Sequence, residues 1–257
     1  MDIPSTSIPE LIEGTVRDRP TAALERLAIL GRYDTGQCVY PSNDAIEHWY
    51  RVVRGAARSS AFSGDGRRYI LDFVFPGDLF GFCGQRARHI CVEAIVSGTL
   101  IARYSRDRAE RLADCDPQTA RNIRQAAFDS IARMQKRTVI LGRASALEKI
   151  SAFLLEMSDR GHTAATGNVF LPMSRYDIAD YLAMAVETVS RTLTELRTRR
   201  TIAFRDSRHV CICDRGALEH CASGLTDVQR QPAPLREKRT HEELSRPSSH
   251  LSVAPGP

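Results

Sequence analysis

Four polar side chains between residues 186 and 198 have the chemistry to read base edges in double-stranded DNA. Glu187, Ser190, Arg191 and Thr194 recur at helical spacing, so they should share one face of a helix. A guanidinium forks onto guanine O6 and N7, a carboxylate accepts from cytosine N4, and a hydroxyl pairs with several partners. We therefore expect Arg191 to bind guanine, Glu187 to accept from cytosine, and Ser190 to contact a base or a phosphate.

The other face of this segment is apolar, and a second short helix precedes it. The residues expected to be buried in the second helix are Val186, Val189, Leu193 and Leu196. The inward face of the first helix should be Ile178, Ala179 and Leu182. Ser174 is the expected N-cap of the first helix, with Asp177 three residues on, and Ala183–Ala185 should form the turn. Two helices joined in this way predict a helix-turn-helix whose second helix enters the major groove.

Basic residues follow the polar face closely, as contacts to phosphates require. An ordinary helix pair with a solvated polar face is the alternative, but the face is short and is not a Glu/Lys ladder. The expected DNA-contacting set is Glu187, Ser190, Arg191, Thr188, Thr194, Arg175, Arg197, Arg199, Arg200 and Arg208.

The run MSRYDIADYLAMAVETVSRTL, residues 173–193, resembles the DNA-binding domain of the Crp/Fnr superfamily of bacterial transcription regulators. It is most similar to the FixK and Fnr branch, whose reading helix carries Glu-x-x-Ser-Arg, and the resemblance extends over about residues 25–220. It implies a homodimer that binds a TTGA-type inverted repeat and contacts RNA polymerase, usually as an activator. Two positions depart from the family pattern, because Ala183 stands where members often have glycine and Ala185 where they have serine or threonine. The missing cap at Ala185 should cost ~1 kcal/mol.

Short strands separated by turns are predicted between about residues 32 and 104, which indicates an all-β sandwich or barrel. The expected strands are Gln37–Tyr40, His48–Val53, Ala56–Phe62, Tyr69–Phe75, Cys91–Ala94 and Thr99–Tyr104. Gly64-Asp65-Gly66 is a hairpin signal between two of them. The break at Gly55 and the turn Pro76-Gly77-Asp78 resemble the jelly-roll sensor domain of the same superfamily.

Helical patterns flank this β region. We expect a short helix over Thr21–Leu30, helices from Ser105 and over Gln118–Leu141, and another over Arg143–Arg160. The long helix carries a narrow apolar seam of coiled-coil type, which favours a dimer interface over packing against its own β domain. The seam is Ile123, Ala127, Ile131, Met134, Thr138 and Leu141.

The predicted fold is therefore α+β. It combines a double-stranded β-helix of the jelly-roll, cyclic-nucleotide-binding-like type with a long dimerisation helix and a C-terminal winged helix-turn-helix. We expect a flexible arm at residues 1–20, the β domain at 21–115, the dimerisation helix at 116–142, the DNA-binding domain at 143–222 and a disordered tail at 223–257. The wing should comprise Thr201–Phe204 and His209–Cys213, after a short strand at Asn168–Leu171.

Composition fits an intracellular regulator. The 257 residues carry a net charge of +5, which permits a polyanionic partner, and 42% hydrophobic residues supply a core. No apolar run approaches the ~20 residues of a membrane span, and no signal peptide is apparent, so we expect a cytoplasmic protein. His-x-His, Gly-x-Ser-x-Gly and Walker motifs are missing from the sequence, so we do not expect an enzyme.

Cofactor signals are weak. An Fnr-type iron–sulfur cluster needs cysteines ahead of the β domain, and the first cysteine is Cys38. For cyclic AMP, Asp78 follows a glycine, but Arg86 and Arg88 do not form the Arg-Ser pair that the Crp branch uses. The remaining candidate ligands are His48 and His89 for haem, and His209, Cys211 and Cys213 for zinc.

We therefore predict neither a cofactor nor a metal. Two alternatives stay open: a regulator gated by cAMP or haem in the β domain, and a non-specific architectural DNA binder, which would show a steep salt dependence without sequence preference. The seven cysteines form no Cys-x-x-Cys motif, and in a reducing cytoplasm most should be free thiols.

Overall fold

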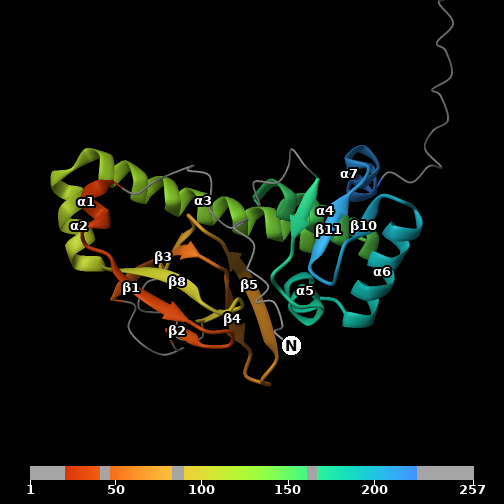
Figure 1. Cartoon of the computed structure of the whole chain (residues 1–257), viewed down its shortest axis with the longest axis horizontal. Helices are drawn as coiled ribbons and strands as arrows, with labels where there is room; N and C mark the ends of the chain where they lie inside the picture. Colours follow the sequence, from red (N-terminus) through yellow and green to blue (C-terminus); the bar gives the residue numbers. More distant parts are fainter. Residues whose placement is uncertain (1–20, 41–46, 83–89, 161–166, 225–257) are drawn as a thin grey trace, which may run out of the picture. The chain divides into compact units, whose positions relative to one another are not determined.

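Two four-stranded antiparallel sheets form the N-terminal part of the chain (Figure 1). The computed structural model describes residues 21–40, 47–82, 90–160 and 167–224, so the predicted arm and the tail from residue 225 lie outside the described residues. One sheet has the order β1 (Ile29–Tyr33), β8 (Thr99–Ser105), β3 (His48–Arg54), β6 (Leu79–Phe80). The other has the order β2 (Cys38–Tyr40), β7 (Ile90–Ala94), β4 (Ala57–Phe62), β5 (Arg68–Val74). The crossovers are those of the predicted jelly roll.

The core of this β domain is aromatic and aliphatic. The Tyr50 ring stacks on Tyr40 with centroids 5.1 Å apart and on Phe80 at 5.5 Å, and Val52 and Ile101 are buried beside them. Rings in this offset arrangement add attraction to the area they bury. The two sheets are therefore joined by a continuous apolar layer.

Two glycines allow the chain to turn where the sequence predicted. Gly66 has φ +80° and closes the β4–β5 hairpin, where its N–H donates to the Ser63 carbonyl at 2.9 Å. Gly55 has φ +87° and lies so close to Thr99 that a Cβ would come within 2.4 Å of the Thr99 Oγ1. Only glycine satisfies both conditions there.

The N-terminal helix is shorter than predicted. Instead of spanning Thr21–Leu30, α1 covers only Ala22–Glu25, and Ile29–Tyr33 is strand β1, paired with β8. Non-local pairing across the sheet overrides the local helical periodicity of this segment. The described chain also contains the two-residue strand β6, which the sequence did not predict.

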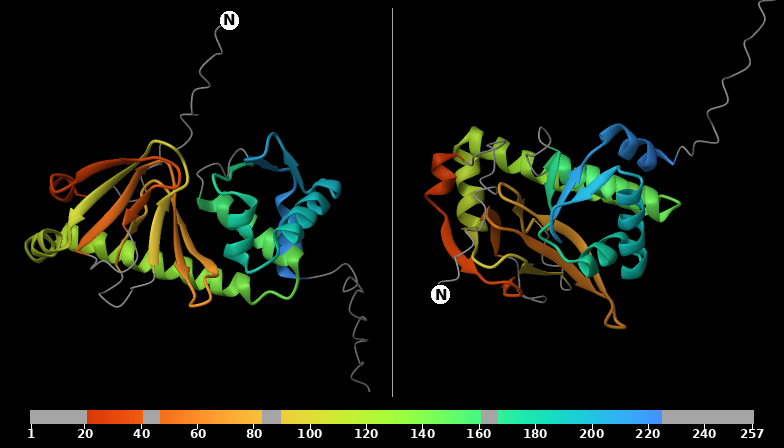
Figure 2. Two further views of the ribbon diagram at one scale, coloured as in Figure 1. Left: turned by 90° about the horizontal axis from the view of Figure 1, so that it is seen from below. Right: turned by 45° about the vertical axis from the view of Figure 1, so that its right-hand side comes forward.

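Three helices follow the sheets: α2 (Arg106–Cys115), α3 (Pro117–Leu141) and α4 (Ala146–Arg160). Helix α3 runs alongside the β domain (Figure 2), where Ile123 and Ala126 pack on the cluster around Trp49 and Leu79. Asp116 caps α3 by accepting from the Gln118 and Thr119 amides, and Pro117 occupies its first turn. None of the helices in the described ranges is long and apolar enough to cross a membrane.

The C-terminal elements are two short helices, a small sheet and a final helix. Helices α5 (Arg175–Leu182) and α6 (Val186–Thr198) lie beside a three-stranded antiparallel sheet. Its strands are β10 (Ile202–Phe204), β11 (His209–Ile212) and β9 (Asn168–Phe170), in that order. The wing is thus present, with β9 as a third strand. The closing helix α7 (Arg215–Ser223) was not predicted.

Candidate nucleic-acid interface

The first helix of the pair begins with the capping box that the sequence predicts. The Ser174 Oγ accepts from the Asp177 amide at 3.1 Å, and the Asp177 Oδ2 accepts from the Ser174 amide at 3.1 Å. The helix ends at Ala183, which has φ +52° and ψ +56°, a left-handed conformation that glycine adopts without strain. The turn therefore forms at the predicted residues despite the missing glycine.

The second helix buries one face and exposes the other. Val189, Leu193 and Leu196 are almost fully buried, and Val186 is half-buried against the same core. The exposed residues on the polar face are Glu187, Ser190, Arg191 and Thr194. The Thr194 hydroxyl donates to the Ser190 carbonyl at 3.0 Å, within the helix. Ala185 is the N-cap of this helix, and its methyl side chain cannot make a capping hydrogen bond.

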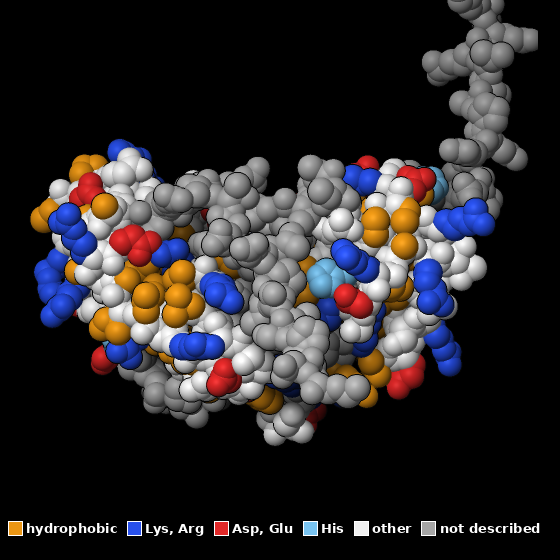
Figure 3. Space-filling model, in the orientation of Figure 1, with side chains coloured by type: hydrophobic (Ala, Val, Ile, Leu, Met, Phe, Trp, Pro, Cys, Tyr) orange, Lys and Arg blue, Asp and Glu red, His pale blue; other side chains and the backbone are white. Residues whose placement is uncertain are grey.

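The residues predicted to contact phosphates differ in their exposure and in their ion pairs. Arg197, Arg199, Arg200 and Arg208 are exposed, although Arg199 pairs with Glu195, one turn earlier. Arginine side chains project along the border of the molecule where α6 lies (Figure 3).

Arg175 and Thr188 differ from these residues because both are partly buried. The guanidinium of Arg175 lies 5.2 Å from the ring centroid of Phe204 on β10, and desolvation by burial lowers its pKa. The Arg175 side chain thus forms a cation–π contact between α5 and strand β10 of the wing.

Two arginines of the β domain bind the start of α5, a contact that no local pattern in the sequence predicts. The Asp177 Oδ1 accepts from Arg58 Nη1 at 2.7 Å and from Arg68 Nη2 at 3.0 Å. Each arginine also binds a second carboxylate: Arg58 binds Glu93 at 2.8 Å, and Arg68 binds Asp180 at 2.7 Å. The Asp177 side chain is only 5% exposed, so its charge depends on these partners.

A second ion-pair cluster joins the long helices to the β domain. Arg133 of α3 and Arg160 of α4 both bind Asp72 on β5 and Asp78 in the turn after it. Arg160 also donates to the Phe73 carbonyl at 2.6 Å. Asp78, the candidate acidic residue for a cyclic nucleotide, is therefore paired with two arginines.

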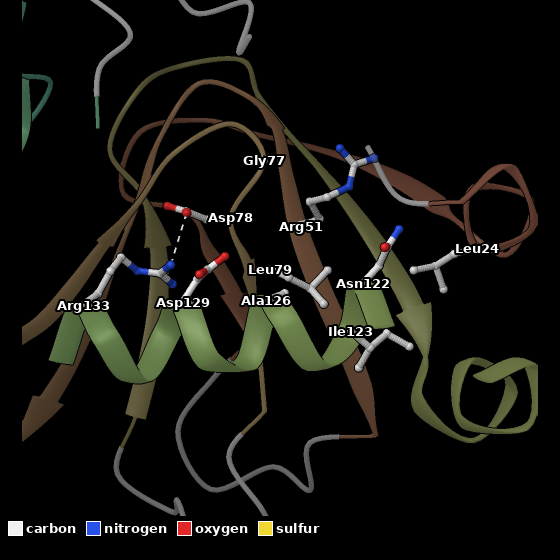
Figure 4. A pocket seen from close by; sticks show the side chains of 10 residues that line it. All are labelled: Leu24, Arg51, Gly77, Asp78, Leu79, Asn122, Ile123, Ala126, Asp129 and Arg133. Carbon is white, nitrogen blue, oxygen red and sulfur yellow. Dashed lines mark hydrogen bonds and ion pairs between the residues drawn. The ribbon is translucent and has the colours of Figure 1, made fainter. Parts of the chain in front are cut away.

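A small cavity lies beside this cluster, between the β domain and α3 (Figure 4). It measures about 60 Å³ and is lined by Arg51, Leu79, Asp129 and Arg133, among others. Pockets that hold ligands of nucleotide size measure roughly 300 Å³ or more. The described residues therefore do not fit a cyclic nucleotide at this place, while Arg86 and Arg88 lie outside the described residues.

The other candidate ligands do not converge in the described chain. His48 lies in β3, and desolvation by burial, with the nearby charge of Arg103, lowers its pKa, whereas His89 lies outside the described residues. The Nδ1 atom of His209 lies 2.7 Å from the Oδ2 atom of Asp206. Within the described ranges, no group of three or more His, Cys, Asp or Glu residues could hold a metal ion.

Three of the six residues of the predicted seam on α3 are exposed. Ile131 is 45% and Met134 53% exposed, and Phe128 and Val139, outside the predicted set, are 56% and 63% exposed. Thr138 is also exposed, whereas Ala127 and Leu141 are partly buried. Ile123 packs on the β domain. The apolar surface of this helix thus extends to Phe128 and Val139.

Comparison with known families matches both halves of the chain. Residues 30–114 match the cyclic nucleotide-binding domain, and residues 148–221 match the Crp-like helix-turn-helix domain.

Relatives and solved structures agree with these matches. The nitrogen fixation regulation protein FixK of Azorhizobium caulinodans is 36% identical over 228 residues, which cover 86% of this chain and 91% of FixK. The transcriptional activatory protein AadR of Rhodopseudomonas palustris is 33% identical over 182 residues, covering 70% of this chain and 76% of AadR. The structure of FixK2 from Bradyrhizobium japonicum superposes with a TM-score of 0.69 at 34% identity, covering 76% of this chain and 96% of FixK2. These relatives are regulators and not enzymes, as the sequence predicted.

Proposed function

The chain belongs to the Crp/Fnr superfamily of bacterial transcription regulators, in its FixK/Fnr-like branch, and from this premise we propose that it is a homodimeric activator that binds a TTGA-type inverted repeat. That it is a DNA-binding transcription regulator follows from the family. The half-site, the reading residues, the dimer and the contact with RNA polymerase are the proposal. As a bacterial DNA-binding regulator it would act in the cytoplasm.

One observation carries the base-reading part of the proposal. Glu187, Ser190 and Arg191 lie together on the exposed face of α6, while the opposite face is anchored in the core. In the described chain the carboxylate of Glu187 and the guanidinium of Arg191 have no intramolecular ion-pair or hydrogen-bond partner. A carboxylate or guanidinium that has no partner within the protein is available to form charge-assisted hydrogen bonds with a ligand. The donors and acceptors on DNA base edges match the geometry of both groups.

The apolar surface of α3 supports the homodimer. Phe128, Ile131, Met134 and Val139 are all about half exposed along one helix. A row of large apolar side chains at this spacing is typical of a helix that pairs with a second copy. Two parallel subunits would place two reading helices on one side of the duplex, as an inverted repeat requires.

Titration of duplexes tests the reading residues. Full-length protein is titrated into labelled duplexes that contain either the TTGA-type palindrome or a scrambled sequence of the same length. Arg191→Ala should weaken binding to the palindrome by ~1–3 kcal/mol, roughly 5- to 150-fold in Kd, and leave scrambled DNA nearly unchanged. Arg111→Ala, at an exposed arginine on α2, is the matched control and should not change either affinity.

Two results would contradict the base-reading proposal. One is an Arg191→Ala protein that binds the palindrome with unchanged affinity. The other is a native protein that binds both duplexes equally with a steep salt dependence, which would favour the architectural DNA binder. Repeating the titration with cAMP tests the cyclic-nucleotide alternative, and we expect an unchanged affinity because Asp78 is already paired with Arg133 and Arg160.

Sedimentation of variants tests the dimer. Ile131→Glu places a charge within the apolar surface of α3 and should convert the protein to a monomer at micromolar concentration. Leu30→Glu, at an equally exposed apolar residue on β1, is the matched control and should remain dimeric. A native protein that sediments as a monomer while binding the palindrome would overturn this part of the proposal.

A further inference from the structure

Two cysteines face each other across neighbouring strands of the β domain. Cys38 on β2 is exposed, Cys91 on β7 is partly buried, and their Sγ atoms lie 3.4 Å apart. We propose that Cys38 and Cys91 form a hydroperoxide-oxidised dithiol site, whose disulfide weakens DNA binding through Glu93 and Arg58. The second half of this inference rests on the proposed function, whereas the first half does not.

The strand pairing explains why the two thiols meet. Cys38 lies opposite Glu93 in the antiparallel β2–β7 ladder, and Cys91, two residues from Glu93, shares its face of the sheet. The two thiols are thus diagonal neighbours on one face. An S–S bond requires about 2.05 Å, so each sulfur must move by less than ~1 Å, a distance that side-chain rotation supplies. Among the other described cysteines, Cys211 and Cys213 are also neighbours, since the Cys211 side chain contributes, after burial, to the raised pKa of Cys213.

The environments of the two thiols set the order of the reaction. Burial raises the pKa of Cys91 to about 12, with further contributions from the hydrogen bond and charge of Cys38 and from the charge of Glu93. Cys91 is therefore a neutral thiol at physiological pH and can donate a hydrogen bond to the Cys38 sulfur while it keeps its proton. Thiolates react with peroxides and thiols do not, so the exposed Cys38 is the group that is oxidised first.

The two steps balance as follows. The Cys38 thiolate attacks the O–O bond of the hydroperoxide, which gives Cys38 sulfenic acid and releases an alcohol, or water when the oxidant is hydrogen peroxide. The Cys91 sulfur then displaces the sulfenic oxygen, which leaves as water with the Cys91 proton, and the S–S bond forms. The two thiols together lose two electrons, which reduce the peroxide. A thiol reductant reverses the change.

The site lies next to the contact that holds the DNA-binding domain. The Nε and Nη2 atoms of Arg58 donate to the Glu93 Oε2, at 3.0 Å and 2.8 Å. The Nη1 atom of the same guanidinium donates to the Asp177 Oδ1 at 2.7 Å. Because Cys38 lies opposite Glu93, the side-chain rotation that closes the disulfide changes the packing around the Glu93 carboxylate, and with it the position of the Arg58 guanidinium that Glu93 orients. The capping carboxylate of α5 then loses part of its support, so we expect the oxidised protein to bind DNA more weakly.

Peptide mapping tests the chemistry directly. Reduced full-length protein is treated with a small excess of hydrogen peroxide, alkylated with N-ethylmaleimide, digested and examined by mass spectrometry. We expect a linked peptide pair joining Cys38 to Cys91, which disappears on reduction. It should be absent from Cys38→Ser and present in Cys115→Ser, the matched control at an exposed cysteine outside the pair. A Cys38 that stops at the sulfenic acid, or pairs with a different cysteine, overturns the proposal.

DNA titration tests the consequence with the same samples. Oxidation should raise the Kd for the palindrome about fivefold or more in native protein and in Cys115→Ser, and leave Cys38→Ser unchanged. A linked peptide with unchanged affinity overturns the coupling to DNA binding. If the reduced protein does not bind the palindrome, the proposed function fails, whereas the peptide map still decides on the disulfide.

Discussion

Replacing Asp177 with alanine should destabilise the protein more than its place in the first turn of a short helix suggests. Its carboxylate accepts from the Ser174 amide and hydroxyl, from Arg58 and from Arg68. Removing one partner of a buried ion pair costs ~3–5 kcal/mol when the other partner is left alone. Here each arginine keeps another carboxylate, Glu93 or Asp180, so this cost is reduced.

Adding the loss of the helix cap, ~1 kcal/mol, gives an expected destabilisation of roughly 2–3 kcal/mol. The corresponding fall in Tm is roughly 5–10 °C for a chain of this size. Urea and thermal unfolding followed by circular dichroism measure both quantities.

Two further variants separate the causes. Asp180→Ala removes a carboxylate that is a third exposed and binds one arginine, so it should cost under ~1 kcal/mol. Asp177→Asn keeps an oxygen for the Ser174 amide but loses the charge, so its cost should fall between those of the two alanine variants. An equal loss of unfolding free energy in Asp177→Ala and Asp180→Ala would refute the view that the Asp177 carboxylate both caps α5 and binds the two arginines.

Three other substitutions have expected outcomes. Ala185→Ser should stabilise the protein by ~1 kcal/mol, because Ala185 already has N-cap dihedrals and lacks only the hydroxyl; an unchanged urea midpoint would contradict this. Gly55→Ala should lower the free energy of unfolding by ~3 kcal/mol or more, because the residue has a left-handed φ and its Cβ would clash with Thr99. Gly36→Ala has a similar φ of +82° but open space around it, so it should lower the free energy of unfolding by only ~1 kcal/mol. Equal unfolding midpoints for the two variants would show that the clash is not decisive. Burial raises the pKa of Glu156, so the folded state favours the protonated form, and the stability of the native protein should fall as pH rises from 4.5 through the raised pKa. Glu156→Gln should therefore gain stability relative to the native protein between pH 5 and pH 8. A constant difference between the two proteins across that range would show that the pKa of the carboxyl is not raised.

Local signals in the sequence predicted the helix pair α5–α6 and its turn well. The Ser174 capping box, the Ala183 turn and the two faces of α6 depend on residues within a few positions of one another, so periodicity and cap chemistry suffice. Helix α7 was missed although Asp214 caps its first turn and Gly224 ends it with φ +72°, signals that were present in the sequence.

What the sequence could not supply is contact between distant segments. Arg58 and Arg68 meet Asp177 across 119 and 109 residues, and nothing in their own neighbourhoods marks them. The strand at Ile29–Tyr33 has the same origin, because its conformation is decided by pairing with β8, about 70 residues later. The approach of Cys38 to Cys91 likewise depends on sheet register.

The cluster of Arg133, Arg160, Asp72 and Asp78 limits how the length of the chain can vary. A residue inserted between Asp72 and Asp78 would displace the partners of α3 and α4 together, so the proposed subunit pairing and the placement of α6 would fail in one step. Lengthening the β4–β5 hairpin at Gly64 would disturb neither arginine. We therefore expect natural length variation among close relatives to accumulate in that hairpin and to be rare in the turn that carries Asp78.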